Sequence, residues 1–313
     1  MEQMEILVID GLSSDRTIQL VKQEIDAGRT NIKLFKNPKR IQASAINIGV
    51  RESNGHYIVR MDAHSTYERH YVEKCVALAK VTGADNVGGI AIATAKTHMG
   101  KAISLALSCS FGVGNSVFRL GGTNGEVESV PFGTFPRTTF EKFGVLNESL
   151  ARCEDKEYNQ RLRKGGGRIV MSKDIKSFYH NRETLSDLAK QSYDNGQWNI
   201  FTLFLNPGAV SMRHLVPLMF VTSLIVLSAL SLVGFLTSTK LLMFAWLLAM
   251  ELGLYLTLNI MFSIKLARKR GFSYLLRLPL IFLAMHLSYG IGSIQGLCRL
   301  PKFIAKEATQ VSH

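Results

Sequence analysis

The sequence contains few cysteines and few charged residues, and each scarcity argues against a class of protein. The four cysteines are widely spaced and form no Cys-x-x-Cys pair, which argues against a disulfide framework and against a zinc site. We expect all four to be buried, reduced thiols; they are Cys75, Cys109, Cys153 and Cys298. Charged residues are only 19% of the 313 residues, whereas hydrophobic residues are 47%. So apolar a composition predicts membrane-spanning segments.

Positive charge is in excess, and its distribution argues against a nucleic-acid partner. The net charge is +13, and nine Lys/Arg against two Asp/Glu from Leu215 onward place +7 of it beside the hydrophobic segments. This distribution fits attraction to anionic lipids. No basic stripe with interleaved aromatic residues occurs elsewhere. The first five residues show no basic and apolar leader pattern, so we expect the first half of the chain to stay in the cytoplasm.

Residues 1–183 alternate short apolar runs with helical patterns. The runs that predict strands are residues 4–10, 32–35, 57–62 and 87–93, and those that predict helices are residues 17–27, 43–52 and 67–81. The alternation predicts an α/β fold with a mostly parallel sheet and helices on both faces. Ligands of such sheets bind beyond the carboxyl ends of the strands, where Asp10 and Asp62 stand.

Residues 184–212 form a second region with an amphipathic pattern. The apolar positions include Leu185, Leu188 and Trp198. One interpretation is a helix at the membrane interface, where tryptophan is enriched. The other is a helix packed on the sheet, because an amphipathic pattern alone does not say which apolar surface it meets.

Residues 213–313 form a membrane region with two or three hydrophobic helices. Residues 215–236 carry no charge, and residues 241–264 carry only Glu251. The basic cluster at 265–270 is expected on the cytoplasmic side, which agrees with a cytoplasmic N-terminal region and two spans. A third segment, residues 278–297, is weaker, and a full span there would place the basic tail outside. The sequence therefore leaves open whether this segment spans the membrane.

Four polar clusters carry candidate chemistry. Asp10 follows the first strand and can accept hydrogen bonds from a nucleoside. Asp62 and His64 follow another strand and together suit a divalent ion, although Asp-x-His alone is a weak signal. The pair Glu154-Asp155 offers a general base at a helix start, where acids also simply stabilise the helix dipole. The last cluster, residues 180–182, contains His180 and Arg182, which suit a metal and a phosphate, or form a solvated turn.

In this order the clusters resemble family 2 glycosyltransferases with the GT-A fold, of the bacterial exopolysaccharide type. The segments that carry the resemblance are MEILVIDGLSSDRT, KNPKRIQASAINIGVRESNGHYIVRMDAHS and VPFGTFPRTTFEKFGVLNESLARCEDKEYNQRLRKGG, and they lie within residues 4–200. The family's metal-binding Asp-x-Asp stands here as Asp62-Ala63-His64. The resemblance implies an inverting transfer of a sugar from a nucleotide sugar, expected to be UDP-linked, in exopolysaccharide or cell-envelope glycan synthesis.

The resemblance also implies roles for individual residues. Asp155 is the expected base, with Glu154 beside it. The expected contacts of the nucleotide sugar are Asp10, Asp62 and Arg182; those of a divalent metal, Mn²⁺ or Mg²⁺, are Asp62, His64 and His180; those of the acceptor are Gly133, Thr134, Arg137, Gln191 and Trp198. The membrane tail implies a lipid-linked glycan acceptor, with the catalytic domain on the cytoplasmic side of a bacterial membrane and a glycan-synthesis complex as a further partner.

Two departures from the family pattern accompany the resemblance. The family's first strand-helix unit, which binds the uridine, has no counterpart, because the sequence starts at the second strand; we therefore expect an unpaired sheet edge. The Gln-x-x-Arg-Trp motif of processive members is also absent, since Gln197-Trp198 stands without the arginine. Two alternatives remain: a non-catalytic, membrane-anchored relative of such enzymes, or a polyprenyl-phosphate monoglycosyltransferase.

Overall fold

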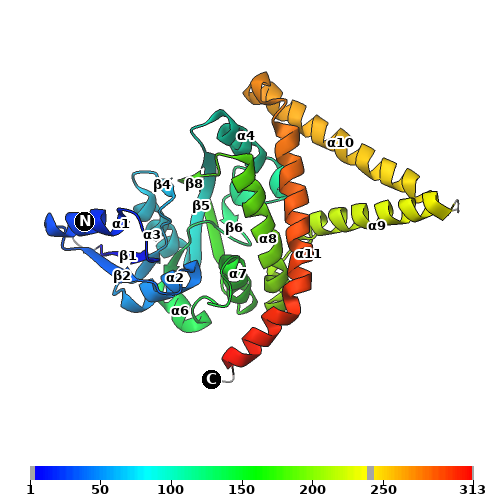
Figure 1. Cartoon of the computed structure of the whole chain (residues 1–313). Helices are drawn as coiled ribbons and strands as arrows, with labels where there is room; N and C mark the ends of the chain where they lie inside the picture. The colour runs from blue at the N-terminus through cyan, green and yellow to red at the C-terminus, as the bar shows by residue number, and fades with distance from the viewer. Residues whose placement is uncertain (1–3, 238–242, 312–313) are drawn as a thin grey trace. The chain divides into compact units, whose positions relative to one another are not determined.

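The computed structural model describes residues 4–237 and 243–311. The chain divides into two compact units, and both are built from segments far apart in the sequence (Figure 1). The first unit contains Met1–Ala91, Gly122–Ser177 and Phe204–Ala209, and the second contains Ile92–Gly121, Phe178–Leu203 and Val210–His313. The second unit thus takes its material from the middle of the chain as well as from the hydrophobic C-terminal region.

The main sheet has six strands. Its order is β3-β7-β5-β8-β4, with β6 pairing on β8. The strands are β3 (Tyr57–Val59), β4 (Ser65–Tyr67), β5 (Asn86–Thr94), β6 (Gly125–Glu126), β7 (Thr134–Pro136) and β8 (Ile169–His180). β7 runs antiparallel to both β3 and β5, and β6 runs antiparallel to β8. The long strands β5 and β8 run from the first unit into the second.

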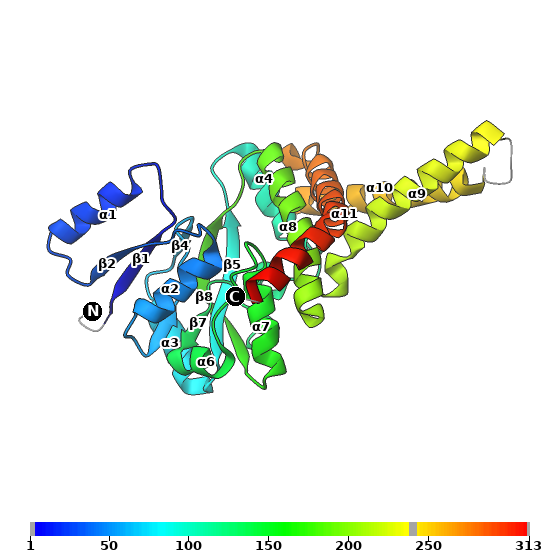
Figure 2. The ribbon, with the colours of Figure 1, turned by 60° about the horizontal axis from the view of Figure 1, so that its bottom comes forward.

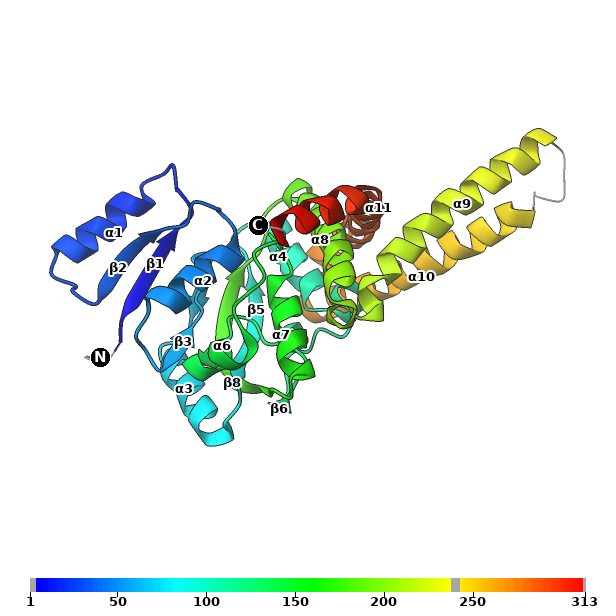
Figure 3. The same ribbon diagram turned by 90° about the horizontal axis from the view of Figure 1, so that it is seen from below.

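A separate two-stranded sheet holds the first residues. β1 (Ile6–Asp10) and β2 (Ile32–Lys36) are parallel, with Asp10 opposite Lys36. Figure 3 shows α1 (Thr17–Asp26) and α2 (Gln42–Glu52) beside this pair. Among the described strands β1 pairs only with β2, and β3 pairs only with β7, so each keeps one unpaired edge, as predicted. The Glu5 carboxylate links the two sheets, because it accepts hydrogen bonds from the backbone N–H groups of Asn54 and Gly55.

Three helices of the first unit pack around an aromatic core. They are α3 (Tyr71–Thr82), α6 (Arg137–Phe143) and α7 (Glu154–Lys164), visible in Figure 2. The rings of Phe135, Phe140 and Tyr158 contact one another with centroids 5.2 to 5.8 Å apart. Phe135 lies on β7 and Tyr158 on α7. This cluster joins the helix that carries Glu154 and Asp155 to the sheet that carries Arg60 and Asp62.

The predicted α/β class with C-terminal apolar helices is confirmed, but the main sheet is mixed rather than mostly parallel. The difference arises at β7, which enters between β3 and β5 in the opposite direction. The residues of β7 directly precede an α-helix in the sequence. A strand of only three residues carries no sequence signal for its direction in the sheet. The segment 67–81, predicted as one helix, instead contains the end of β4 and then α3.

The second unit is mostly helical. It contains α4 (His98–Leu107), α5 (Ser110–Val113), η1 (Val117–Arg119), α8 (Leu185–Leu205), η3 (Met212–His214), α9 (Val216–Thr237), α10 (Met243–Arg270), η5 (Phe272–Tyr274) and α11 (Leu278–Val311); η2 (Pro207–Ala209) belongs to the first unit. Its core joins α4, α8 and α11. The buried members include Ile103, Leu188, Ile281 and Phe282.

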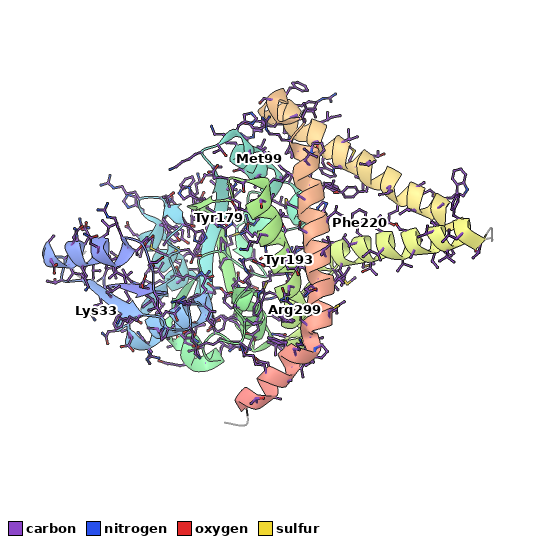
Figure 4. All side chains as sticks on the ribbon, viewed as in Figure 1. Lys33, Met99, Tyr179, Tyr193, Phe220 and Arg299 are labelled. Atoms are coloured by element: carbon purple, nitrogen blue, oxygen red, sulfur yellow. The ribbon has the colours of Figure 1, made fainter. Side chains whose placement is uncertain are left out.

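The region 184–212, which has the amphipathic pattern, contains α8 (Leu185–Leu205), and the apolar face of this helix is covered by protein. Gly196 and Gly292 allow close approach of α8 and α11, because a Cβ at either would come within 2.0 Å of a backbone oxygen of the other helix. The rings of Phe201 and Phe303 stack at 4.4 Å. In Figure 4, Tyr193 on α8 and Arg299 on α11 mark the two helices. The cover is therefore α4 and α11, which neither sequence interpretation named.

Three helices are long and apolar enough to cross a membrane: Met212–Thr237, Met243–Arg270 and Leu278–Thr309. The first two match the predicted spans, although positions 241 and 242 of the second lie outside the described residues. The third segment extends well beyond the predicted residues 278–297 and is 39% buried in its most apolar window, against 6% for the first. It therefore packs more closely against the rest of its unit than α9 does.

All four cysteines carry free thiols. Cys75 and Cys109 are buried, as predicted. The prediction was wrong for Cys298, which is exposed on α11, and incomplete for Cys153, which is half-buried. A position on a helix of the apolar tail does not by itself bury a side chain, because only one stripe of α11 meets other helices.

Candidate active site

Asp62 lies just beyond the end of β3 and is held by several donors. Arg60 donates from Nε to Asp62 Oδ1 at 3.0 Å and from Nη2 to Oδ2 at 3.3 Å, a two-pronged ion pair. Gln42 Nε2 adds a bond to Oδ1 at 3.0 Å, and the backbone N–H of Asp62 contacts the Tyr67 hydroxyl at 2.7 Å. The Asp62 side chain is only 11% exposed. The turn between β3 and β4 therefore presents a fixed carboxylate.

The same guanidinium reaches the start of α7. Arg60 Nη1 lies 3.5 Å from Glu154 Oε1, and the Glu154 side chain is 5% exposed. Cys153, the residue before α7, has a φ of 64°, a left-handed conformation that turns the chain sharply into the helix. Asp155 is half-buried, and its Oδ1 accepts a hydrogen bond from the N–H of Lys156 at 2.8 Å. Carboxylates from two distant segments thus meet around one arginine.

Burial and neighbouring charges shift the pKa values of Glu154, Arg60 and Tyr67. Burial, followed by the nearby Asp155 carboxylate, raises the pKa of Glu154 to about 7, against the lowering effect of Arg60. The carboxylates of Asp62, Glu154 and Asp155 outweigh the effect of burial and raise the pKa of Arg60, so that it stays charged. Burial also raises the pKa of Tyr67 to about 12. Arg60 is therefore a permanent cation, whereas Glu154 changes charge near neutral pH.

Asp10 lies at the end of β1 in the two-stranded sheet, about fifty residues before Arg60 in the sequence. It is 5% exposed and accepts two hydrogen bonds from the N–H of Ser13, at 3.0 and 3.3 Å; hydrogen bonds from the side chain and then the backbone of Ser13 lower its pKa. Its backbone oxygen accepts from the N–H of Asn37 at 2.7 Å, and Asn37 donates from its side chain to the Ile41 carbonyl, next to Gln42. The loop after β2 thus connects the end of β1 to the residue that bonds Asp62.

The described side chains around Asp62 do not form the ligand set of a divalent ion. Among residues 4–237 and 243–311, no three His, Cys, Asp or Glu side chains are grouped so as to hold one. Both oxygens of Asp62 accept hydrogens from Arg60, and His64 is exposed in the turn before β4. As they stand, the residues provide an ion pair rather than a metal site, and the resident cation at Asp62 is Arg60.

The residues predicted to line the acceptor side in the first unit have structural contacts. Thr134 is fully buried on β7, and a Cβ at Gly133 would lie 2.5 Å from Asn86 Oδ1. The carbonyl of Gly133 accepts from the N–H of Arg60 at 3.1 Å. The Arg137 guanidinium donates to the carbonyls of Val50, Ser53 and Gly55, which fixes the end of α2. Because all three nitrogens of the Arg137 guanidinium already donate and the Thr134 hydroxyl is buried, these two side chains have little to offer a ligand.

Four other predicted site residues belong to the second unit. His180 Nδ1 lies 3.1 Å from Thr94 Oγ1 at the ends of β8 and β5, and Arg182 is exposed just beyond β8. On α8, Gln191 Nε2 donates to the Tyr179 hydroxyl at 3.1 Å. The Trp198 ring contacts the rings of Phe201 and Phe303 edge-on, so it takes part in the packing of α8 on α11.

Sequence reasoning missed Arg60 and Gln42. Arg60 stands two residues before Asp62, and a charged residue inside an otherwise apolar strand was the available signal. A long cation there must find an acid once the strand is buried. Gln42 gave no signal, because its contact depends on how the loop 37–41 places the start of α2.

The N-terminal part of the chain matches a known protein family. Residues 1–100 match the model of the glycosyl transferase family 2 domain. The succinoglycan biosynthesis protein ExoA of Rhizobium meliloti is 29% identical over 215 residues, which cover 68% of this chain and 65% of that protein. These matches place the chain among the glycosyltransferases. They support a family 2 glycosyltransferase, as the sequence resemblance predicted.

A second relative matches nearly the whole chain. It is the dolichyl N-acetyl-alpha-D-glucosaminyl phosphate 3-beta-D-2,3-diacetamido-2,3-dideoxy-beta-D-glucuronosyltransferase of Methanococcus voltae, 24% identical over 308 residues, 95% of this chain and 88% of that protein. The match to ExoA, by contrast, spans just under two thirds of that relative.

The chain is also similar to two solved structures, at TM-scores below 0.5. S. aureus TarS 1-349 covers 93% of this chain and 81% of its own, with 13% identity and a TM-score of 0.46. GalNAc-T7, solved with UDP, GalNAc and Mn²⁺, covers 57% of this chain and 38% of its own, with 15% identity and a TM-score of 0.44.

Proposed function

We propose that the protein is an inverting transferase that moves a sugar from a nucleotide sugar, UDP-linked, to a lipid-linked or polysaccharide acceptor in exopolysaccharide or cell-envelope glycan synthesis. The observation that carries the proposal is the cluster around Arg60. It brings Asp62, at the end of a strand, within reach of Glu154, at the start of a helix, with Asp155 beside it. The carboxylate proposed for the donor, Asp62, and the one proposed for the acceptor, Asp155, thereby lie near the same arginine.

The donor side of the proposal uses Asp10, Asp62 and Arg182. Asp10 is rigid, because Ser13 holds both its oxygens, and it is ionised, because those bonds lower its pKa. It therefore acts as a hydrogen-bond acceptor for the nucleoside. The carboxylates of Asp62, Glu154 and Asp155 would repel a diphosphate. The positive charge of Arg60 offsets part of this repulsion. We assign Arg60 a positioning role, since it orients Asp62 and Glu154.

The acceptor side of the proposal uses Asp155. Glu154 is buried and paired with Arg60, whereas Asp155 is half-buried and therefore partly open to solvent. Asp155 takes the proton as the acceptor oxygen attacks the anomeric carbon. The oxygen–carbon bond forms while the bond from that carbon to the diphosphate breaks, and the nucleoside diphosphate leaves with the electron pair. Positioning of the two substrates and base catalysis supply the acceleration.

The proposal contains no metal step, because the arrangement at Asp62 does not fit an ion. The Mn²⁺ or Mg²⁺ requirement that the resemblance implied, with Asp62, His64 and His180 as ligands, is measured directly by assaying with each ion and with a chelator. The side chains that remain as proposed acceptor contacts are Gln191 and Trp198 of α8, both half-buried.

The C-terminal helices support a membrane location and an acceptor carried by a lipid. We propose that residues 1–183 form the catalytic region, on the cytoplasmic side of the membrane, that α8 lies in a connecting region at 184–212, and that residues 213–313 hold the protein in the bilayer. A site kept at the membrane raises the effective concentration of a lipid-linked acceptor. The name of the Methanococcus voltae relative describes a dolichyl-phosphate-linked acceptor, which supports this choice.

The test is release of UDP from a panel of UDP-sugars by membranes that contain the protein, with and without lipid-linked acceptor. We expect acceptor-dependent release for one donor. Absence of release with every donor, from protein that binds UDP, would favour the non-catalytic alternative. Transfer to polyprenyl phosphate itself, independent of Asp155, would favour the monoglycosyltransferase.

A further inference from the structure

Helix α10 presents two different stripes along its length. One stripe faces other helices of the second unit: Asn259 and Ser263 are buried, Asn259 donates to the Pro279 carbonyl at 3.1 Å, and Ala267 is fully buried. Further along the helix, Glu251 bonds Ser223 of α9 at 2.5 Å. These contacts fix the rotation of α10 about its axis, and so determine which residues point away from α9 and α11.

The other stripe lines an open groove of about 670 Å³. Its residues are Thr257, Ile260, Met261, Ile264, Lys265, Arg268 and Lys269. Their spacing of one, three or four residues places them on one face of the helix. The first four have no formal charge and the last three are cationic, so the groove is apolar along one part and strongly positive at the end of the apolar segment.

The three cations of the groove have no acidic neighbour. The groove contains no carboxylate, and no ion pair joins Lys265, Arg268 or Lys269 to any residue in the described part of the chain. Lys265 contacts the Phe262 ring, 5.9 Å from its centroid. Each of the three residues is exposed. The groove therefore lacks its own counter-charge, which a bound anion with an apolar chain would supply.

We propose that this groove binds the phosphate end of a polyprenyl phosphate or diphosphate, the carrier of the lipid-linked acceptor. The phosphate contacts Lys265, Arg268 and Lys269, and the first isoprene units lie on Ile260 and Ile264. Three cations match the two negative charges that a free polyprenyl phosphate monoester, or the diphosphate bridge of a lipid-linked glycan, carries at pH 7 better than the single charge of a phospholipid diester. This inference rests on the proposed function for its substrate class, and it adds the site.

The test measures binding without catalysis. Full-length protein in nanodiscs of zwitterionic phosphatidylcholine is titrated with fluorescent polyprenyl phosphate. The groove variant is Lys265→Gln/Arg268→Gln/Lys269→Gln. The matched control, Arg299→Gln/Lys302→Gln/Lys306→Gln, removes the same charge from α11. We expect affinity to fall by roughly 100-fold in the groove variant, at about fivefold per removed charge near a membrane surface, and by less than about threefold in the control.

Competitors identify the ligand. Uncharged polyprenol should not displace the probe, and phosphatidylglycerol should displace it only at far higher concentration. An equal loss in both triple variants, or equal displacement by phosphatidylglycerol, would overturn the proposal in favour of general attraction to anionic lipid. Retention of affinity by a folded groove variant would also overturn it. Because no donor is present, a failure of sugar transfer leaves this result unaffected, so the two proposals fail separately.

Discussion

Arg60 Nη1 lies 3.5 Å from Glu154 Oε1 and joins the end of β3 to the start of α7. The two residues are far apart in the sequence, and both side chains are largely removed from solvent. The same arginine also holds Asp62 with two hydrogen bonds. Removing one partner of such a buried group leaves charge without compensation, which is the costly way to break an ion pair.

Replacement of this arginine should therefore destabilise the protein. We expect Arg60→Gln to lower the unfolding free energy by about 3 kcal/mol, because Asp62 keeps its charge in a poorly solvated place and Glu154 must bind a proton or do the same. Thermal unfolding in detergent measures the change. Arg51→Gln is the control: its pair with Glu52 is exposed, at 68% and 35%, so the loss should stay below about 1 kcal/mol. Equal effects of the two substitutions would contradict a structural role for Arg60.

Arg60 should also exclude divalent cations from Asp62. With the guanidinium gone, three carboxylates face one another without a cation, and we expect Arg60→Gln to bind Mn²⁺ more tightly than the unchanged protein, by roughly tenfold for one removed unit charge at close range. Electron paramagnetic resonance of free Mn²⁺ measures this without any assay of transfer. Arg60→Lys, which keeps the charge, should bind Mn²⁺ as weakly as the unchanged protein. Identical Mn²⁺ affinity in Arg60→Gln would show that Arg60 does not occupy the cation position.

Asp155→Asn should remove base catalysis and spare donor binding. General-base catalysis contributes about 10²- to 10⁴-fold, so we expect a loss of kcat in this range with the affinity for UDP-sugar changed less than about threefold. Acceptor-dependent UDP release and equilibrium binding give the two quantities. Asp174→Asn, at an exposed position on β8, is the matched control and should leave both unchanged. A variant that keeps most of its rate would move the base elsewhere.

Stability should depend on pH through Glu154. The pKa of Glu154 is about 7 in the folded protein and 4.5 in the unfolded chain, so the folded state binds the proton more tightly. The contribution of Glu154 is then complete below pH 4.5 and is lost as the pH rises through 7. We expect the thermal midpoint of the unchanged protein to fall more between pH 5 and 8 than that of Glu154→Gln. Parallel pH profiles of the two proteins would contradict the raised pKa.

Close packing of α8 on α11 should be sensitive to a single methyl group. We expect Gly196→Ala to destabilise the protein by about 1 to 3 kcal/mol, because the new Cβ would lie 2.0 Å from the carbonyl oxygen of Tyr289. Gly253→Ala on α10 is the control, since a Cβ there meets nothing within 4 Å. Thermal unfolding of both variants in detergent provides the comparison, and equal midpoints would mean that the two helices separate readily.

Sequence patterns determined the type of most elements and the family. Runs of apolar residues that end in an acid predicted β1 and β3, and long uncharged runs predicted α9 and α10, because burial and a bilayer both require such runs. Glu154 and Asp155 were recognised as a pair at a helix start, and α7 begins there. These features are local, so neighbouring residues suffice to predict them.

Tertiary structure alone decided the direction of β7, the partners of α8 and the cation at Asp62. Each depends on contacts between residues remote in sequence. Thr134 and Arg137 appeared as candidate acceptor contacts, but the fold buries the first and gives the second to the carbonyls after α2. Arg60 appeared as an ordinary strand residue until α7 brought Glu154 to it. A side chain's chemistry can be read from its type, whereas its partner is fixed only when the chain has folded.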